Sequence, residues 1–96
     1  QYRLLVELNQ KRAEGWANMG YVLLATKRVE EADEAVEQSI ALNPDYEQAW
    51  WNKAAICYQY KDADCMKTVY NQIRRLNPGN PKLQALKQAV AQWQSS

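Results

Sequence analysis

The chain has 96 residues, of which 47% are hydrophobic and 24% are charged, and its formal net charge is +1. This balance excludes wholesale disorder, and the length allows one small domain. A net charge near zero provides no basic surface for nucleic acid, and no apolar run approaches the ~20 residues that a membrane span needs. We therefore expect neither a nucleic-acid partner nor membrane insertion.

Apolar residues recur at helical spacing throughout the chain, and the two-residue alternation of strands is missing. In chain order, this pattern predicts helices over residues 2–8, 13–26, 29–42, 47–60, 63–76 and 81–93. Asn43-Pro44 and Asn77-Pro78 are expected to end the preceding helices, because a residue before proline is driven out of the helical region. The connections are only a few residues long, so consecutive helices are expected to run antiparallel.

The sequence repeats with a fixed period. The pairs Leu8-Asn9, Leu42-Asn43 and Leu76-Asn77 lie 34 residues apart, as do Trp16 and Trp50. A period of this length is typical of stacked supersecondary units rather than of one globular core. Stacked units form extended binding surfaces, so the period predicts a recognition module.

The residues within each period follow a recognisable order. The first period reads Trp16-x₂-Met19-Gly20-x₂-Leu23, Ala32-x₃-Val36 and Pro44, and the second reads Trp50-x₂-Lys53-Ala54-x₂-Cys57, Met66-x₃-Tyr70 and Pro78. This order resembles the tetratricopeptide repeat, a helix–turn–helix of about 34 residues with the pattern W-x₂-L-G-x₂-Y, A-x₃-F and P. The resemblance implies an all-α fold in which antiparallel helix pairs stack into a right-handed superhelix.

On this resemblance, residues 1–96 form a single domain of about two and a half repeats. Residues 1–12 fit the second half of an earlier repeat, 13–46 and 47–80 are repeats, and 81–96 form a capping helix. Gly20 is expected at a close contact between two helices, since glycine otherwise weakens a helix. Lys53 replaces an apolar residue of the family pattern, so we expect looser packing there or a lysine that turns outward.

Residue types suited to catalysis are scarce in this chain. It has no histidine, and its two cysteines and its carboxylates form no zinc or general-base arrangement. We therefore expect no enzyme activity, no metal and no cofactor. Cys57 and Cys65 lie near the facing ends of two helices, whose axes ~8–10 Å apart usually exceed disulfide reach; this favours free thiols. The acidic stretch from Glu30 to Glu37 is expected to be a solvated helix start.

The tryptophans are expected to have two roles. Trp16 and Trp50 match the packing tryptophan of the family, which implies a place in the core. Trp51 is turned about 100° away on the same helix. In the family, the first helix of each repeat lines a concave groove, and the alternative for these side chains is packing against missing repeats or another copy. In this chain, the residues predicted to line the groove are Ala17, Asn18, Tyr21, Leu24, Trp51, Asn52, Ala55 and Tyr58.

The predicted function is a protein–protein interaction module that binds a peptide or a partner helix in this groove. One alternative is a structural or self-assembly segment of a larger repeat protein, and another is an accessory domain of an enzyme whose catalytic part lies elsewhere. Residues 1–12 expose Leu4, Leu5 and Leu8 without a pairing helix. Such an apolar strip is costly in water, so it favours a homodimer through the N-terminal helix.

Overall fold

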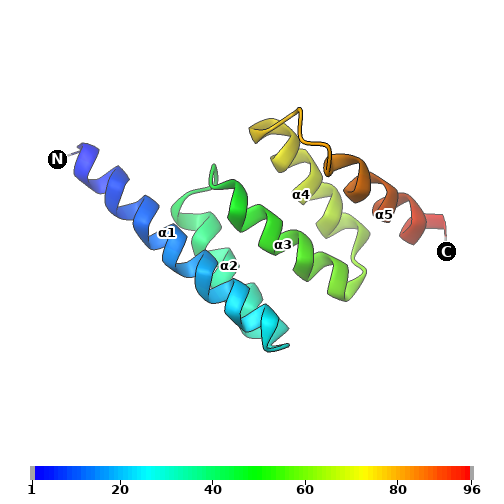
Figure 1. Ribbon diagram of the computed structural model, residues 1–96, viewed down its shortest axis with the longest axis horizontal. Helices are drawn as coiled ribbons and strands as arrows, with labels where there is room; N and C mark the ends of the chain where they lie inside the picture. Colours follow the sequence, from blue (N-terminus) through cyan, green and yellow to red (C-terminus); the bar gives the residue numbers. More distant parts are fainter. Residues whose placement is uncertain (1, 96) are drawn as a thin grey trace.

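The structure is a computed structural model that describes residues 2–95, with side chains from residue 8 to residue 94. Within this range the regular elements are α1 (Tyr2–Ala25), α2 (Val29–Leu42), α3 (Glu47–Tyr60), α4 (Ala63–Leu76) and α5 (Leu83–Ser95). Successive helices run antiparallel, with turns at alternating ends, and the two termini lie at opposite ends of the molecule (Figure 1). The body measures 50 × 31 × 18 Å. The predicted all-α solenoid of helix pairs is confirmed.

The first helix differs from the prediction. It runs without interruption from Tyr2 to Ala25, so the break predicted between residues 8 and 13 is wrong. Asn9 has the phase of the residues that end later helices, but no proline follows it, and residues 10–12 (Gln-Lys-Arg) are good helix formers. Residues 2–12 therefore lengthen α1 instead of forming half of another pair. Leu4 and Leu5 lie outside the residues whose side chains are described.

The bounds of α2, α3 and α4 agree with the prediction, and α5 begins two residues later than expected. The backbone N–H groups of Asn43 and Asn77 donate to the carbonyls of Ser39 and Ile73, which closes α2 and α4. Before α5, Asn80 Oδ1 accepts a hydrogen bond from the Lys82 N–H at 2.9 Å. This local turn keeps residues 81 and 82 out of the helix.

Two clusters of buried residues hold the levels of the stack together. Gly20 allows α1 and α2 to approach closely, because a Cβ at this position would lie 2.7 Å from Val36 Cγ2. The predicted role of Gly20 is thus confirmed. The smaller cluster, between α2 and α3, is Ala32, Val36 and Ile56. The larger cluster joins α3, α4 and α5 through Trp50, Ala54, Cys57, Met66, Val69, Ile73, Leu83, Leu86 and Val90.

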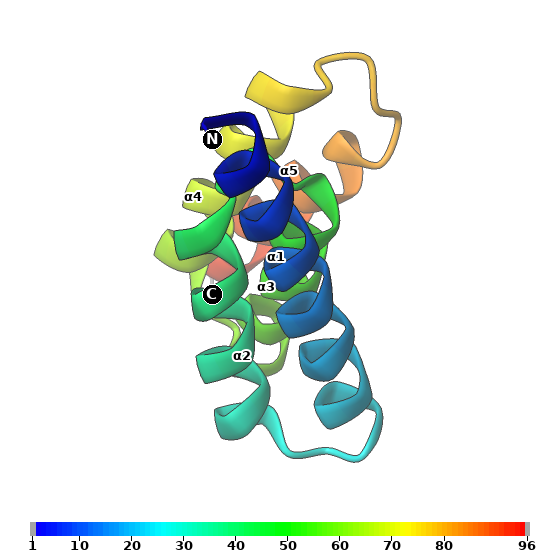
Figure 2. The ribbon, with the colours of Figure 1, turned by 90° about the vertical axis from the view of Figure 1, so that its left-hand side faces the viewer.

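The two equivalent tryptophans differ in burial. Trp50 is 8% exposed, and its indole N–H donates to the Pro44 carbonyl at 2.7 Å. Trp16 is 37% exposed, so the expectation of a core position is correct for Trp50 and wrong for Trp16. Trp16 belongs to α1, which with α2 forms one end of the stack, where no further helix of the described chain covers it (Figure 2).

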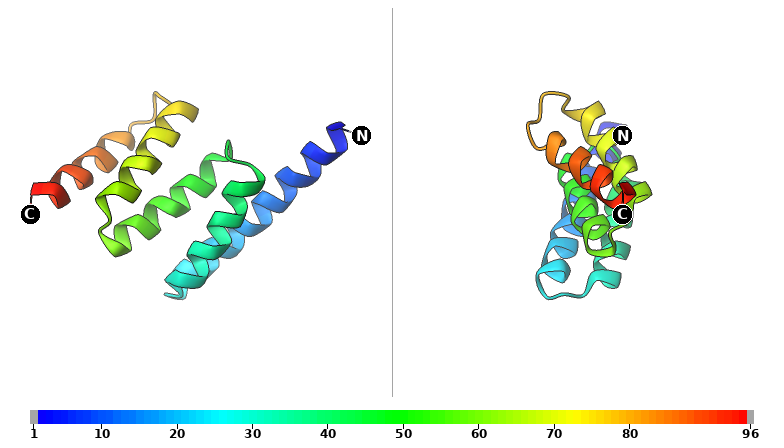
Figure 3. Two further views of the ribbon diagram at one scale, coloured as in Figure 1. Left: turned by 180° about the vertical axis from the view of Figure 1, so that it is seen from behind. Right: turned by 90° about the vertical axis from the view of Figure 1, so that its right-hand side faces the viewer.

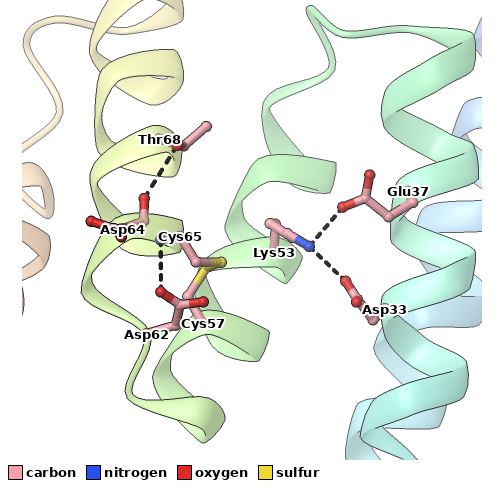
Figure 4. The surroundings of a disulfide bond; sticks show 8 residues. All are labelled: Asp33, Glu37, Lys53, Cys57, Asp62, Asp64, Cys65 and Thr68. Carbon is pink, nitrogen blue, oxygen red and sulfur yellow. Dashed lines mark hydrogen bonds and ion pairs between the residues drawn. A yellow bond between two sulfur atoms is a disulfide. The ribbon is translucent and has the colours of Figure 1, made fainter.

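Cys57 and Cys65 form a disulfide between α3 and α4, which overturns the expectation of free thiols (Figure 4). Their Cα atoms are 5.6 Å apart, within the usual range for a disulfide. Lys61 adopts the left-handed conformation (φ 51°) and lets the chain reverse within two residues. Next to so short a turn the two helices converge, so the axis separation of packed helices is a poor guide to the distance between these cysteines.

Candidate binding groove

The eight residues predicted to line a groove belong to α1 and α3, the first helices of the two pairs. The exposed residues are Asn18, Tyr21, Ala55 and Tyr58. The half-buried residues are Leu24 and Trp51, so six of the eight are accessible from solvent. The buried residues are Ala17 and Asn52.

Ala17 and Asn52 differ from the expectation because they lie where α3 packs against α1. Ala17 is fully buried, and Asn52 is 4% exposed. The Asn52 Nδ2 donates to the Ala17 carbonyl at 2.9 Å, and the Asn52 Oδ1 accepts from Gln48 Nε2 at 3.2 Å. The Asn52 amide therefore bonds two groups of its own chain rather than a ligand. Its role is to fasten the two levels of the stack.

Trp51 is held in a fixed orientation at the junction of α3 and α5. Its indole N–H donates to Glu47 Oε2 at 2.9 Å, and its ring packs against the larger core cluster. Asn80 Nδ2 lies 3.4 Å from the same carboxylate oxygen. Lys82 Nζ lies 5.9 Å from the centre of the Trp51 ring, at the limit of a cation–π contact. One side of the ring is thus bound to the protein, while the residue remains partly exposed.

A hollow of about 370 Å³ lies beside Trp51. It combines an aromatic surface with a carboxylate, an ammonium group and two amides, so it has groups for apolar contact and for hydrogen bonding. The residues that line it are Glu47, Gln48, Trp51, Asn80 and Lys82.

Trp93 extends the aromatic surface and was missing from the prediction. Its ring centre lies 5.7 Å from that of Tyr58, with the ring planes inclined by 57°, which is a favourable arrangement for two aromatic rings. Trp93 stands 34 residues after Gln59, which the helical phase places on the groove side of α3. Extending the period into the last helix would have revealed it. We call Tyr21, Trp51, Ala55, Tyr58 and Trp93 the aromatic groove.

The acidic start of α2 has a specific role that the sequence did not reveal. Lys53 Nζ lies 2.6 Å from Asp33 Oδ1 and 2.6 Å from Glu37 Oε1, and its side chain is 18% exposed (Figure 4). Burial alone would lower the pKa of Lys53, but the hydrogen bonds to Asp33 and Glu37 outweigh it and raise this pKa above 10.5. The lysine thus turns toward α2 and ties the two helix pairs together, away from the groove.

The described residues offer little for chemistry other than binding. Among the side chains that the structure describes, residues 8–94, no three of His, Cys, Asp or Glu are placed to hold a metal ion. None of the described helices is long and apolar enough to cross a membrane. Figure 3 shows the stack from behind and from its C-terminal end, with α1, α3 and α5, the helices that carry the aromatic-groove residues, following one another along it.

Comparison with known proteins identifies the repeat. Residues 13–46 match the family described as Tetratricopeptide repeat. This match spans α2 and the second half of α1. No curated protein and no solved structure gives a significant match to the chain.

Proposed function

Since residues 13–46 are a tetratricopeptide repeat, a unit that generally mediates protein–protein interaction, we propose that this chain binds a peptide or a partner helix in its aromatic groove. The family is typically non-enzymatic. The observation that carries the proposal is the exposure of aromatic side chains on one side of the stack. Tyr21 and Tyr58 are 63% and 61% exposed, although aromatic side chains are usually largely buried.

The chemistry of the groove favours a particular kind of ligand. Tyr58, Trp93 and Trp51 provide apolar surface, and the small side chain of Ala55 leaves room for a ligand group between larger neighbours. Charges are balanced beside Trp51, because one carboxylate, Glu47, and one ammonium group, Lys82, both line the hollow. An extended or helical segment with apolar or aromatic anchors therefore fits better than a strongly acidic tail.

The test begins with selection of peptides from a displayed random library, using the whole chain as bait. The affinity of a selected peptide is then measured for Tyr58→Ala and for a matched control, Tyr60→Ala. Both tyrosines are on α3 and similarly exposed, at 61% and 54%, but Tyr60 lies beside a different hollow with Lys27 and Arg28. We expect Tyr58→Ala to weaken binding by about 1–3 kcal/mol and Tyr60→Ala to leave it unchanged.

Two outcomes would overturn the proposal. Equal losses in the two variants would place the peptide elsewhere, and so would binding that disappears at moderate salt, because the groove recognises its ligand mainly through apolar contacts. Circular dichroism and a thermal melt of Tyr58→Ala exclude a folding defect, which matters because Tyr58 contacts Trp93 on α5.

A further inference from the structure

At one end of the stack, α1 exposes a set of positions whose equivalents in α3, 34 residues later, are buried or half-buried. Asn52, Lys53 and Ile56 of α3 contact the preceding pair, and Ala49 near them on the same helix is fully buried. The positions 34 residues earlier belong to α1 and are exposed. Together with Leu8, 46% exposed, and Trp16, they form what we call the end face: Leu8, Gly15, Trp16, Asn18, Met19 and Val22.

The equivalent positions of α3 indicate what such a surface does. Ala49 is fully buried, Ile56 packs against Ala32 and Val36, and Asn52 donates to a backbone carbonyl of α1. The same surface of α5 is buried through Leu83, Leu86 and Val90. Among α1, α3 and α5 of the described chain, α1 is thus the one helix that exposes this surface to solvent.

No contact within the described chain requires a glycine at position 15. A Cβ added at Gly15 would meet no atom within 4 Å, whereas one at Gly20 would clash with Val36. A glycine inside a helix lowers its stability relative to alanine, so its use in the middle of α1 calls for a benefit elsewhere. Close approach of another helix is such a benefit, since Gly15 removes the side chain that would hold the two backbones apart.

The end face continues into a hollow of about 440 Å³ between α1 and α2. Trp16, Met19 and Leu23 line its α1 side. Met19 is 51% exposed, and Trp16 adds further accessible apolar surface. Exposed apolar surface of this kind, rimmed by polar groups, marks interaction sites. The residues that α2 contributes to the hollow are Glu31, Glu34, Ala35 and Gln38.

We propose that the end face binds a second copy of this chain, with the two α1 helices antiparallel and crossing at Gly15. Leu8 and Val22 each lie seven residues from Gly15, which is about two helical turns, so all three share one side of α1. A two-fold axis through Gly15 then places Leu8 of one protomer against Val22 of its partner. The surface is complementary to itself, as a two-fold interface requires.

The charges around the end face favour this orientation. Lys11, Arg12 and Glu14 precede Gly15 and leave one net positive charge there. Glu31, which pairs with Arg28 at 3.8 Å, and Glu34 of α2 lie at the rim of the hollow beside the second half of α1. Antiparallel pairing brings the basic half of each α1 toward the acidic rim of the other copy, and parallel pairing would bring like charges together. A head-to-tail stack is disfavoured because α5 exposes the polar side chains of Gln84 and Gln88 at the other end of the stack.

The first test is sedimentation equilibrium of the whole chain and of two matched variants. Val22→Glu places a carboxylate in the end face, and Tyr21→Glu places one on the neighbouring, groove side of α1; the two residues are 58% and 63% exposed. We expect a concentration-dependent dimer whose dissociation constant rises at least about tenfold in Val22→Glu and stays unchanged in Tyr21→Glu. A monomer at all accessible concentrations, or a dimer that both variants weaken equally, would overturn the proposal.

The second test addresses the two-fold axis itself. Gly15→Cys should form a disulfide-linked dimer on mild oxidation, because the two Cα atoms at the crossing would lie within disulfide reach. Ala25→Cys, exposed on the same helix but ten residues from the crossing at Gly15, serves as the control and should remain monomeric, because the two-fold axis would hold the two Ala25 positions far apart. Equal cross-linking of the two variants, or higher oligomers in place of dimers, would contradict an antiparallel pair of α1 helices.

Discussion

The two helix pairs have the same period and the same topology, yet they differ in what surrounds them. The pair α3 and α4 lies between α2 and α5, and a disulfide joins its helices. The pair α1 and α2 has a neighbour on one side, and within the described chain its outer side is open. The same tryptophan position is consequently 8% exposed in one pair and 37% in the other.

This difference shows that a repeat pattern specifies the shape of a surface, whereas neighbours decide whether that surface is core or interface. In a stack, each unit contacts only the units next to it, so stability depends on unit contributions and on the contacts between them. Lys53 of α3 and Met19 of α1 occupy equivalent positions and illustrate the point. Lys53 forms an ion pair with Asp33 of α2, whereas Met19 is apolar and exposed.

The largest expected effect compares Trp50→Ala with Trp16→Ala. Trp50 is buried in the larger core cluster, so its removal should lower the free energy of unfolding by about 3–5 kcal/mol. Trp16 is more exposed, and its removal should cost only about 1–2 kcal/mol. Urea denaturation at low protein concentration measures both losses. Equal losses would show that the two pairs are covered to the same extent.

The disulfide should account for the next largest effect. Cys57 and Cys65 close a loop with a sequence separation of 8. Removing this cross-link with the double substitution Cys57→Ala/Cys65→Ala should lower the free energy of unfolding by about 2–3 kcal/mol, because the unfolded chain regains freedom. Dithiothreitol should destabilise the unmodified chain and leave the double variant unaffected. A chain whose melting is insensitive to reductant would contradict the bond.

A reciprocal exchange tests the electrostatic contact between the pairs. Lys53→Met removes the partner of Asp33 and Glu37 and should lower the free energy of unfolding by about 1–2 kcal/mol. Met19→Lys places the lysine at the equivalent exposed position of α1 and should change stability little. The comparison is made by denaturant titration. If the two substitutions gave the same loss, the contact with α2 would be without energetic consequence.

The smallest effect concerns alkaline pH. Lys53 has a raised pKa in the folded chain, so its stabilising contribution is complete below the unfolded value of about 10.4 and is lost as the pH rises through the folded value. The difference in unfolding free energy between the unmodified chain and Lys53→Met should therefore be constant near neutral pH and shrink above about pH 10.5. A difference that grows with rising pH would contradict the assignment.

The sequence predicted the fold well, because the period and the prolines carry most of the information. Helices α2, α3 and α4 have their predicted bounds, set by Asn43-Pro44, Asn77-Pro78 and the apolar spacing. The break near Asn9 failed because the asparagine was read by analogy with these sites, although the proline that enforces them is absent. A repeat pattern thus predicts a helix end correctly where a proline prevents the helix from continuing, and it fails where no such residue is present.

The contacts between levels were harder to predict than the helices. Helical phase gave the exposed positions of Tyr21, Ala55 and Tyr58, but it could not separate them from Asn52, which points toward the neighbouring helix instead. Partners such as Lys53 with Asp33 depend on the distance between helices, which phase does not supply. The disulfide was missed for the same reason, because its geometry is set by the conformation of the turn at Lys61.

Native-state amide hydrogen exchange tests most directly whether neighbours set the stability of each pair. The Val22→Glu variant is the suitable sample, because it keeps the chain monomeric if the end face is the dimer contact. Amides of α3 and α4 should then exchange only through global unfolding, while those of α1 should exchange through smaller openings that begin at the end of the stack. Uniform protection across α1–α4, or protection greatest in α1, would contradict this.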